Sequence, residues 1–384
     1  MKILLIGPAS PYRGGIANFN DSLYAALDRN HEPHIINYSL QYPAVLFPGR
    51  SQYEKGAPYT SARSRNLINS VNPFSWRYSS DQIAGMSPDL IIVHYWVPFF
   101  APALGRIIRR LKKKTGIPVI GLLHNVQPHE GMPAARIFNR YFLAACDGFI
   151  TMSSTVSGDL EKIGIRRPLK QVFHPLYDIF GEPVSREFAC HCLGLDTELN
   201  YLLFFGIIRN YKGLSLLLKS FANHRISHLD LRLLVAGEFY ENETRYLDMV
   251  EELGLEKKIM FTNSFVPKEE VAWYFAAADL VVLPYLSATQ SGVTQIAYNF
   301  ERPMLVTNVG GLKEVVRHGH VGYVCEKDPE EIAAAIADFF DNDRAAEFTA
   351  NTRSEKKKFS WEAMVKGVEE LFENIKAGHG GNPC

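Results

Sequence analysis

Cysteines are few in this chain of 384 residues, and long apolar runs are absent. The five cysteines are an odd number scattered along the sequence, which suits reduced thiols in a cytosol better than a disulfide framework. No apolar run approaches the roughly 20 residues that would span a bilayer. The first residues, Met1–Gly7, have the pattern of a short strand and not of a signal peptide. We therefore expect a cytoplasmic protein.

An excess of charge of either sign is also missing. Lys and Arg together number 41, as do Asp and Glu, so nothing in the overall charge favours nucleic acid as a partner. The only D-x-D motif, Asp341–Asp343, lies at a predicted helix end, and no carboxylate pair ends a predicted strand where it could hold a divalent ion. The dinucleotide fingerprint G-x-G-x-x-G is absent too. We expect neither a metal nor a nicotinamide cofactor, and any attraction to phosphate must be local.

The length predicts about two domains, and the pattern in both halves is strand and helix in alternation. Short continuous apolar runs of this kind are typical of parallel strands that are covered on both faces. They predict strands at Ile3–Ile6, Leu90–Val93, Val119–Leu123, Gly148–Thr151, Tyr201–Gly206, Leu231–Ala236, Lys258–Thr262, Leu280–Pro284, Pro303–Thr307 and Gly322–Val324. Helical periodicity follows at Ile16–Leu27, Leu104–Lys114, Leu214–Asn223, Thr244–Leu253, Glu269–Ala277, Val293–Phe300 and Glu330–Phe340.

The fold class is therefore α/β, with two Rossmann-like parallel-sheet domains. We expect an N-terminal domain over 1–180, a C-terminal domain over 181–358, and a helix over 359–384 that returns to the first domain. Two segments break the rhythm. Tyr38–Trp76 is predicted to be a functional loop or lid, and His174–Leu199, with broken periodicity, an interdomain hinge.

Three loops follow predicted strands, where open α/β sheets bind their ligands. In the first, Gly14 and Gly15 directly precede a helix, so their backbone N–H groups and the helix dipole could meet an anion. The alternative is a tight turn whose glycines only satisfy backbone geometry.

The second loop, Phe205–Gly213, contains Arg209 and Lys212 three residues apart at a strand-to-helix turn. Arginine offers a bidentate fork and lysine a mobile point charge, which together suit a diphosphate. The alternative is that both are ordinary solvated surface cations. The position of the pair at a strand end favours a functional role.

The third loop, Pro284–Gln295, is a polar run of Ser, Thr and Gln that opens a helix. Such a run presents hydroxyls and free N–H donors. Ser291 or Thr289 could also simply cap the helix. The two roles are compatible, because both use the same helix end.

These loops carry a family resemblance. The second half is similar to the retaining glycosyltransferases of family 4, which have the GT-B architecture, in Phe205–Gly213, in the LLVAGE stretch that ends at Glu238, in Val282–Pro284 and in Arg302–Val316. The first half resembles the family through Gly14-Gly15 and the strand that ends at His124-Asn125. The GPxxPYRGGI start and the TQSG stretch resemble bacterial envelope-polysaccharide and surface-glycan transferases.

The resemblance implies two domains facing a central cleft and sugar transfer from a nucleotide-sugar donor to a saccharide or lipid-linked saccharide. By it, Arg209 and Lys212 would hold the diphosphate, Gly14 and Gly15 would face it from the opposite domain, and His124 would lie beside the transferred sugar. A lone histidine after a strand is otherwise more often structural. The further donor-binding candidates are Gly206, Glu238, Thr289, Gln290, Ser291, Gly292, Val293 and Gln295. The reaction would retain configuration by front-side attack, with no metal and no strong catalytic carboxylate.

The chain departs from the family where two glutamates eight residues apart are usual. Ala288 and Ile296 occupy those positions, so Thr289, Gln290 or Gln295 would have to replace them. The usual arginine just after the strand glycine is Ile207. These departures keep two alternatives open, namely a non-catalytic nucleotide-sugar-binding subunit and another GT-B enzyme such as a nucleotide-sugar epimerase.

A basic segment in the first half concerns the acceptor. Aromatic and apolar residues from Trp96 onward precede six cations, which are Arg106, Arg109, Arg110, Lys112, Lys113 and Lys114. This pattern resembles a helix that rests on an anionic membrane, at the inner face of the cell membrane. The alternative is an ordinary Rossmann helix with a basic outer end.

Overall fold

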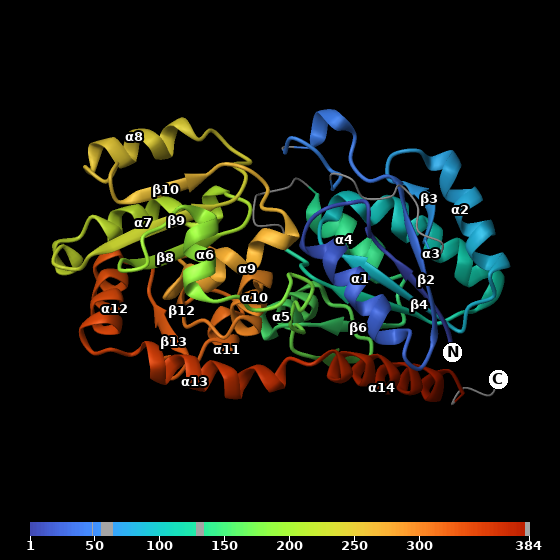
Figure 1. Ribbon diagram of the computed structural model, residues 1–384. Coiled ribbons are helices and arrows are strands. Elements are labelled where there is room, and N and C mark those ends of the chain that lie inside the picture. Colours follow the sequence, from blue (N-terminus) through green and yellow to red (C-terminus); the bar gives the residue numbers. More distant parts are fainter. Residues whose placement is uncertain (48, 55–63, 128–133, 381–384) are drawn as a thin grey trace. The chain divides into compact units, whose positions relative to one another are not determined.

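The computed structural model describes residues 1–47, 49–54, 64–127 and 134–380. The chain divides into two compact units, one formed by Met1–His174 with the chain from Trp361 on, the other by Pro175–Ser360. Each unit is built on its own parallel sheet with helices on both faces (Figure 1). The predicted α/β class with two parallel-sheet domains is confirmed.

The N-terminal unit contains a seven-stranded sheet in the order β3-β2-β1-β4-β5-β6-β7. Its central strands β1, β4 and β5 are almost wholly buried, which explains their continuous apolar sequences. The strands are β1 (Lys2–Ile6), β2 (Glu32–Leu40), β3 (Ser64–Asn69), β4 (Leu90–Tyr95), β5 (Val119–Leu123), β6 (Gly148–Thr151) and β7 (Leu169–Gln171). The helices are α1 (Gly15–Leu27), α2 (Pro73–Gly85), α3 (Ala101–Thr115), α4 (Ala135–Leu143), α5 (Ser154–Ile163) and α14 (Trp361–Gly380).

The C-terminal unit contains a six-stranded sheet in the order β10-β9-β8-β11-β12-β13. Its strands are β8 (Asn200–Phe205), β9 (Leu231–Ala236), β10 (Ile259–Thr262), β11 (Leu280–Leu283), β12 (Met304–Thr307) and β13 (Gly322–Cys325). Its helices are α6 (Arg186–Leu193), α7 (Leu214–Phe221), α8 (Thr244–Glu252), α9 (Lys268–Ala277), α10 (Gly292–Asn299), α11 (Leu312–Val315), α12 (Pro329–Asp341) and α13 (Ala345–Glu355).

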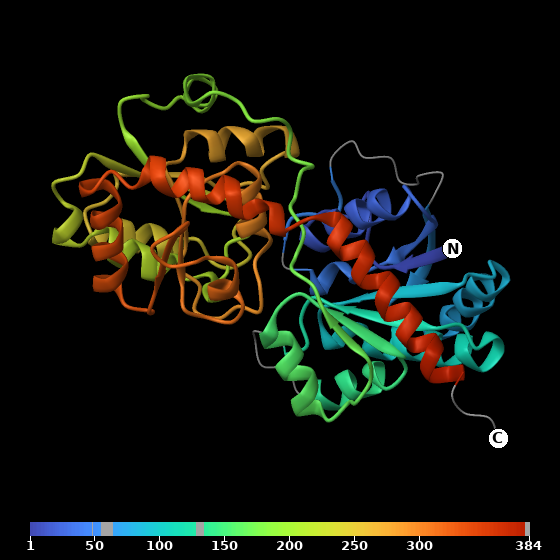
Figure 2. The ribbon, with the colours of Figure 1, turned by 90° about the horizontal axis from the view of Figure 1, so that it is seen from below.

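Helix α14 (red in Figure 2) belongs to the N-terminal unit, where it packs on α1, β6 and β7. The contacts are close because two glycines leave room for them. A Cβ on Gly148 would lie 2.8 Å from Ile375 Cδ1, and a Cβ on Gly367 would lie 2.6 Å from Val172 Cγ2. On α14, Glu369 also bonds His31, with 2.9 Å between the Glu369 oxygen and His31 Nε2.

The prediction of an irregular loop over Tyr38–Trp76 is wrong at both ends of that segment, which belong to regular elements. The segment includes the last residues of β2, the whole of β3 and the start of α2, at Pro73. β3 is the edge strand and β2 lies next to it, and both mix polar with apolar residues, so they lack the continuous apolar run of the central strands. Residues 48 and 55–63 of this loop lie outside the described residues.

The hinge predicted over His174–Leu199 contains a helix, α6, which packs on α9. The buried residues of α6 are small, Ala189 and Cys190, and give little periodic signal. The helix is also held by its first residue, because the Arg186 guanidinium bonds both carboxylate oxygens of Asp279, at 2.8 and 3.3 Å. This part of the segment is therefore an integral element of the C-terminal unit.

The basic segment after Trp96 forms α3, whose apolar residues are buried in the N-terminal core. Four of its six cations have partners within the same unit. Arg110 and Lys114 both contact Asp81, Lys112 pairs with Asp147, and Arg109 lies 3.9 Å from the centre of the Tyr141 ring. These contacts are those of an ordinary Rossmann helix. Across the described ranges, no helix has the length and apolar character needed to cross a bilayer.

Candidate active site

The loops that follow the central strands of a parallel sheet all emerge at one edge, which is where such sheets bind ligands. In the C-terminal unit these loops follow β8, β9, β11 and β12. In the N-terminal unit they follow β1, β4 and β5. All of the predicted site residues of each unit lie in these loops or in the first turns of the helices behind them.

The loop after β8 turns back over itself and brings Lys212 to the strand end. Gly206 and Gly213 have φ values of +99° and +74°, which favour glycine. A Cβ on Gly206 would lie 3.2 Å from Lys212 Nζ, so the ammonium folds over the glycine that ends the strand. Arg209 stands at the start of the intervening 3-10 turn, and its guanidinium lies 5.5 Å from the centre of the Tyr240 ring.

The environment of Lys212 is apolar on one side and lacks a counter-ion. Its ammonium lies 5.3 Å from the centre of the Tyr285 ring, within the range of a cation–π contact. Burial, with a smaller contribution from the charge of Arg209, lowers the pKa of Lys212 below its ordinary value. In the part of the chain that the structure describes, no carboxylate lies within 4.0 Å of this ammonium. A bound anion would therefore pair with an ammonium group that is already partly desolvated.

The loop after β11 begins α10 with a side-chain cap. The Ser291 hydroxyl accepts a hydrogen bond from the Val293 N–H at 3.2 Å, as Ser does at helix starts. Ser291 Oγ also lies 3.1 Å from the Tyr285 hydroxyl. The predicted cap at Ser291 is thus confirmed, and one tyrosine connects this cap to Lys212.

Polar side chains of this third loop are buried. Thr289 and Gln295 are 7% and 1% exposed, while Gln290 is half-buried. The Gln295 amide nitrogen is 3.5 Å from Thr294 Oγ1, and its oxygen Oε1 is buried with no hydrogen-bond partner among the described residues. A buried unpaired acceptor costs free energy and calls for an explanation.

The two positions at which the family usually carries glutamate are both apolar and buried. Ala288 is 8% and Ile296 is 5% exposed. The backbone at Ala288 is pressed against the loop after β12, because a Cβ on Gly310 would lie only 1.7 Å from the Ala288 carbonyl oxygen. Neither side chain can accept a hydrogen bond, so any recognition of hydroxyls in this region uses other residues.

Glu238, in the loop after β9, is buried and next to β8. Its backbone carbonyl accepts from the Ile208 N–H at 2.9 Å, which joins the loops after β8 and β9. The approach is close because Gly237 has no side chain, and a Cβ there would lie 1.9 Å from the Gly206 oxygen. The structure therefore brings Gly206, Glu238, Arg209 and Lys212 into one set of adjoining loops.

In the N-terminal unit, Gly14 precedes α1 and Gly15 is its first residue. Gly14 has a φ of +113°, a Cβ there would meet nothing within 4 Å, and no side chain caps the helix. The start of α1 is thus open on the side of Gly14.

His124 lies directly after β5, is 7% exposed, and belongs to a cluster of buried rings. His124 Nε2 is 2.9 Å from Nδ1 of His94, which lies on the adjoining strand β4. The ring of Phe19, from α1, meets His124 and His174 edge to face, with both pairs of centroids 5.0 Å apart. The pKa of His124 is held well below its ordinary value by burial first and by its histidine neighbours second.

Two residues that organise these sites, His94 and Tyr285, are not evident from the sequence. His94 follows a run that was predicted to end at Val93, and its partner is 30 positions away. Tyr285 lies inside the third loop, but only the folded chain sets it against Lys212. A polar aromatic residue at the end of a buried strand was the available signal in both cases.

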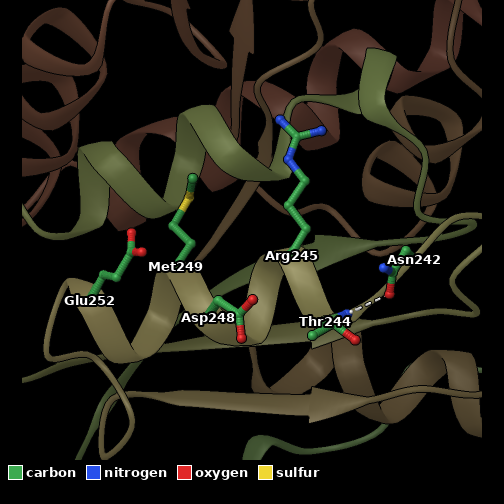
Figure 3. Close-up of a pocket in the computed structure, with 6 residues that line it drawn as sticks. All are labelled: Asn242, Thr244, Arg245, Asp248, Met249 and Glu252. Carbon is green, nitrogen blue, oxygen red and sulfur yellow. Dashed lines mark hydrogen bonds between the residues drawn. The ribbon is translucent and has the colours of Figure 1, made fainter.

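The chain also has a pocket that contains none of the predicted site residues (Figure 3). It is lined by six residues that lie along α8 and in the turn before it, namely Asn242, Thr244, Arg245, Asp248, Met249 and Glu252. Arg245 Nη1 lies 3.4 Å from the side-chain oxygen of Asn210, the neighbour of Arg209. Through Asn242, the pocket shares the loop after β9 with Glu238.

Relatives match both halves of the chain. Residues 13–178 match the family described as Glycosyltransferase Family 4, and residues 200–342 match the family described as Glycosyl transferases group 1. The D-inositol 3-phosphate glycosyltransferase of Thermobispora bispora is 26% identical over an alignment of 306 residues, which covers 74% of this chain and 70% of that protein.

Solved structures share the fold at low sequence identity. Sucrose-phosphate synthase from Thermosynechococcus elongatus has a TM-score of 0.78 at 18% identity, covering 98% of this chain and 99% of its own. Anabaena HepE in complex with UDP has a TM-score of 0.71 at 16% identity, covering 98% of this chain and 100% of its own. With two parallel-sheet units and both halves matched, the chain is a glycosyltransferase of GT-B architecture.

Proposed function

We propose that this enzyme transfers a sugar from a nucleotide-sugar donor to a saccharide acceptor, free or lipid-linked, with retention of configuration and without a metal ion. The observation that carries the proposal is the ammonium of Lys212, set beside Arg209 at the end of β8 with no carboxylate partner among the described residues. A cation in this position suits the diphosphate of a nucleotide, and the HepE structure holds UDP.

The proposed chemistry is stabilisation of a leaving group. As the bond from the sugar to the diphosphate breaks, negative charge grows on the phosphate oxygen, and Lys212 and Arg209 would meet it without reorganisation. The acceptor hydroxyl would attack from the same face and pass its proton to that oxygen. The only D-x-D motif begins at Asp341, the last residue of α12, which bonds His228 at 2.9 Å. His228 lies just before the first residue of β9, whereas the candidate site lies after the last residues of the strands. This location supports a role for Arg209 and Lys212, in place of a metal held by the motif.

Thr289, Gln290 and Gln295 are the proposed readers of donor hydroxyls, in place of the two usual glutamates. Gln295 is the strongest of these, because its Oε1 acceptor is buried and unpaired among the described residues. The helix start formed by Ser291, Gly292 and Val293 would face the phosphates, as would Gly14 and Gly15. His124 is the proposed contact to the transferred sugar.

We place the reaction in the cytoplasm, since Cys146, Cys190, Cys192 and Cys325 are free thiols. A membrane contact through α3 would depend on Arg106 and Lys113, the exposed cations of this helix that have no carboxylate partner among the described residues, because the apolar side of the helix is buried in the N-terminal core. Any contact of α3 with an anionic membrane would therefore be electrostatic, without insertion of the helix into the bilayer.

Calorimetry with UDP, GDP, ADP and their sugar conjugates, followed by transfer assays with and without EDTA, tests the function. We expect one nucleotide to bind and its conjugate to give a product with retained anomeric configuration in EDTA. An altered sugar nucleotide formed without acceptor would instead identify an epimerase. Tight binding without turnover on a broad acceptor panel would identify a binding subunit, an outcome that Ala288 and Ile296 would explain. Absence of binding to every nucleotide would refute the proposal.

A further inference from the structure

Two buried histidines at the ends of the neighbouring strands β4 and β5 are joined by a hydrogen bond. His94 Nδ1 lies 2.9 Å from His124 Nε2, and the two rings are nearly parallel, with 18° between their planes. In a bond between two imidazoles, one nitrogen carries the proton and the other accepts it. The protonation of either ring therefore fixes that of the other.

Both rings are neutral at ordinary pH. Burial lowers the pKa of His94 to about 3, and burial together with its histidine neighbours holds the pKa of His124 well below the usual value. Each ring thus has a single N–H, on either Nδ1 or Nε2. Two arrangements satisfy the bond, and they differ in which histidine donates.

The surroundings of His94 decide between the two arrangements. Its second nitrogen, Nε2, is buried and has no hydrogen-bond partner among the described residues. A proton on Nε2 would bury a donor without an acceptor, and orphaned buried N–H groups are rare in proteins. A proton on Nδ1 is used in the bond to His124. His94 is therefore the donor, and His124 accepts through Nε2.

It follows that His124 carries its own proton on Nδ1. We propose that His94 is a positioning residue that locks His124 in the Nδ1–H tautomer, so that His124 offers a donor, and not an acceptor, to an oxygen of the bound sugar. The role toward the sugar rests on the proposed function, whereas the tautomer is a property of the protein alone.

Packing keeps the pair in this arrangement. The Phe19 ring meets His124 and His94 edge to face, with centroids 5.0 and 5.9 Å away. On another side, the backbone of Gly7 is so close that an added Cβ would lie 2.9 Å from His94 Cδ2. Neither ring can turn over without displacing these neighbours, so the proton stays where the hydrogen bond places it.

The test uses full-length protein labelled with ¹⁵N in its 12 histidines. Long-range ¹H–¹⁵N correlation spectra distinguish a protonated ring nitrogen from a bare one, and His124→Gln assigns the signals of His124. We compare His94→Asn, whose amide nitrogen replaces Nδ1, with His94→Phe, which keeps a ring and removes the donor. We expect Nδ1–H at His124 in the wild type and in His94→Asn, and loss of this single tautomer in His94→Phe.

Kinetics provide the second readout. We expect His94→Phe to lower kcat by about tenfold or more, as loss of a residue that orients a functional group does. Affinity for the nucleoside diphosphate, which lacks the sugar, should be unchanged, and His94→Asn should recover most of kcat. Equal loss in both variants would reduce His94 to a packing residue and overturn the proposal.

A wild-type spectrum with the proton on Nε2 of His124 would overturn the tautomer assignment directly, even if His94→Phe failed to fold. The test also separates this inference from the proposed function. If the spectra show the expected tautomers while the wild type transfers no sugar, the function fails and the lock between His94 and His124 stands.

Discussion

The ammonium of Lys212 lies over the ring of Tyr285, 5.3 Å from its centre, while the hydroxyl of the same ring is 3.1 Å from Ser291 Oγ. One side chain thereby joins the cation that follows β8 to the residue that begins α10. An anion held by Lys212 would lie near this helix start, where free N–H groups and the helix dipole favour negative charge. The relationship makes the two loops one candidate binding surface.

Lys212→Ala should lower kcat/KM by at least about tenfold, and Arg209→Ala should do the same. A hydrogen bond to a charged group contributes about 1.5–3 kcal/mol, and each 1.4 kcal/mol is about a factor of ten. Lys219→Ala is the matched control, an exposed lysine on α7, the helix that follows this loop. Steady-state transfer kinetics measure the change, and circular dichroism checks the fold. Wild-type rates in both site variants would refute the assignment.

The affinity for a nucleoside diphosphate should fall as the pH rises into the alkaline range. The fall should begin at a lower pH than it would if Lys212 had the pKa of an ordinary lysine. The pKa of Lys212 is lowered by burial, so its positive charge is present below that pKa and is lost as the pH rises through it. The binding constant should therefore be level near neutral pH and then fall before pH 10.5, the ordinary value. Calorimetry over this range measures it. Lys212→Arg should remove the fall, since arginine stays charged, and an identical profile in that variant would contradict the prediction.

The central strands were predictable because burial on both faces imposes a physical pattern. Strands β1, β4, β5, β8 and β9 have continuous apolar sequences, and each was found within a residue or two of its ends. The edge strand β3 and its neighbour β2 escaped detection, since both contain polar residues that interrupt the apolar run. Helix α6 escaped because it packs through small residues and through Arg186, whose partner Asp279 is 93 positions away.

The same difference between local and long-range sequence patterns explains which features of the site were predictable. Arg209 and Lys212 were identified because glycines and cations at a strand end are a pattern that a few consecutive residues contain. The contact of Lys212 with Tyr285 and that of His124 with His94 join separate strands, so no local pattern shows them. Sequence thus indicated which residues carry charge, and the fold shows which neighbours hold them.

Gly213→Ala should destabilise the protein by about 2–5 kcal/mol. The residue has a φ of +74°, and a Cβ would lie 1.9 Å from the Pro284 oxygen, so strain of about 1–2 kcal/mol adds to an overpacking cost of about 1–3 kcal/mol. Gly254→Ala is the control, because its φ is +65° but its surroundings are open. Urea unfolding should show about 1 kcal/mol for the control. Equal losses would mean that the contact between the loops after β8 and β11 does not constrain residue 213.

Asp279→Ala tests whether α6 is part of the C-terminal unit. Asp279 accepts from both terminal nitrogens of Arg186 and, at 2.7 Å, from the Tyr201 N–H at the start of β8. Bonds to a charged group contribute about 1.5–3 kcal/mol. We expect a loss of about 2 kcal/mol, which lowers Tm by roughly 4–8 °C for a unit of this size.

The control for Asp279→Ala is Glu182→Ala, which removes an exposed carboxylate from the segment before α6 and should change stability by no more than about 0.5 kcal/mol. A hinge that merely connects two bodies would tolerate both substitutions equally. A helix that packs on α9 as part of the unit would not, because Arg186 would keep its carbonyl partners at Ala277 and Leu199 yet lose its counter-ion. Amide hydrogen exchange over 186–193 should then be faster in Asp279→Ala and unchanged in Glu182→Ala. Unchanged exchange in Asp279→Ala would mean that the segment is only a linker.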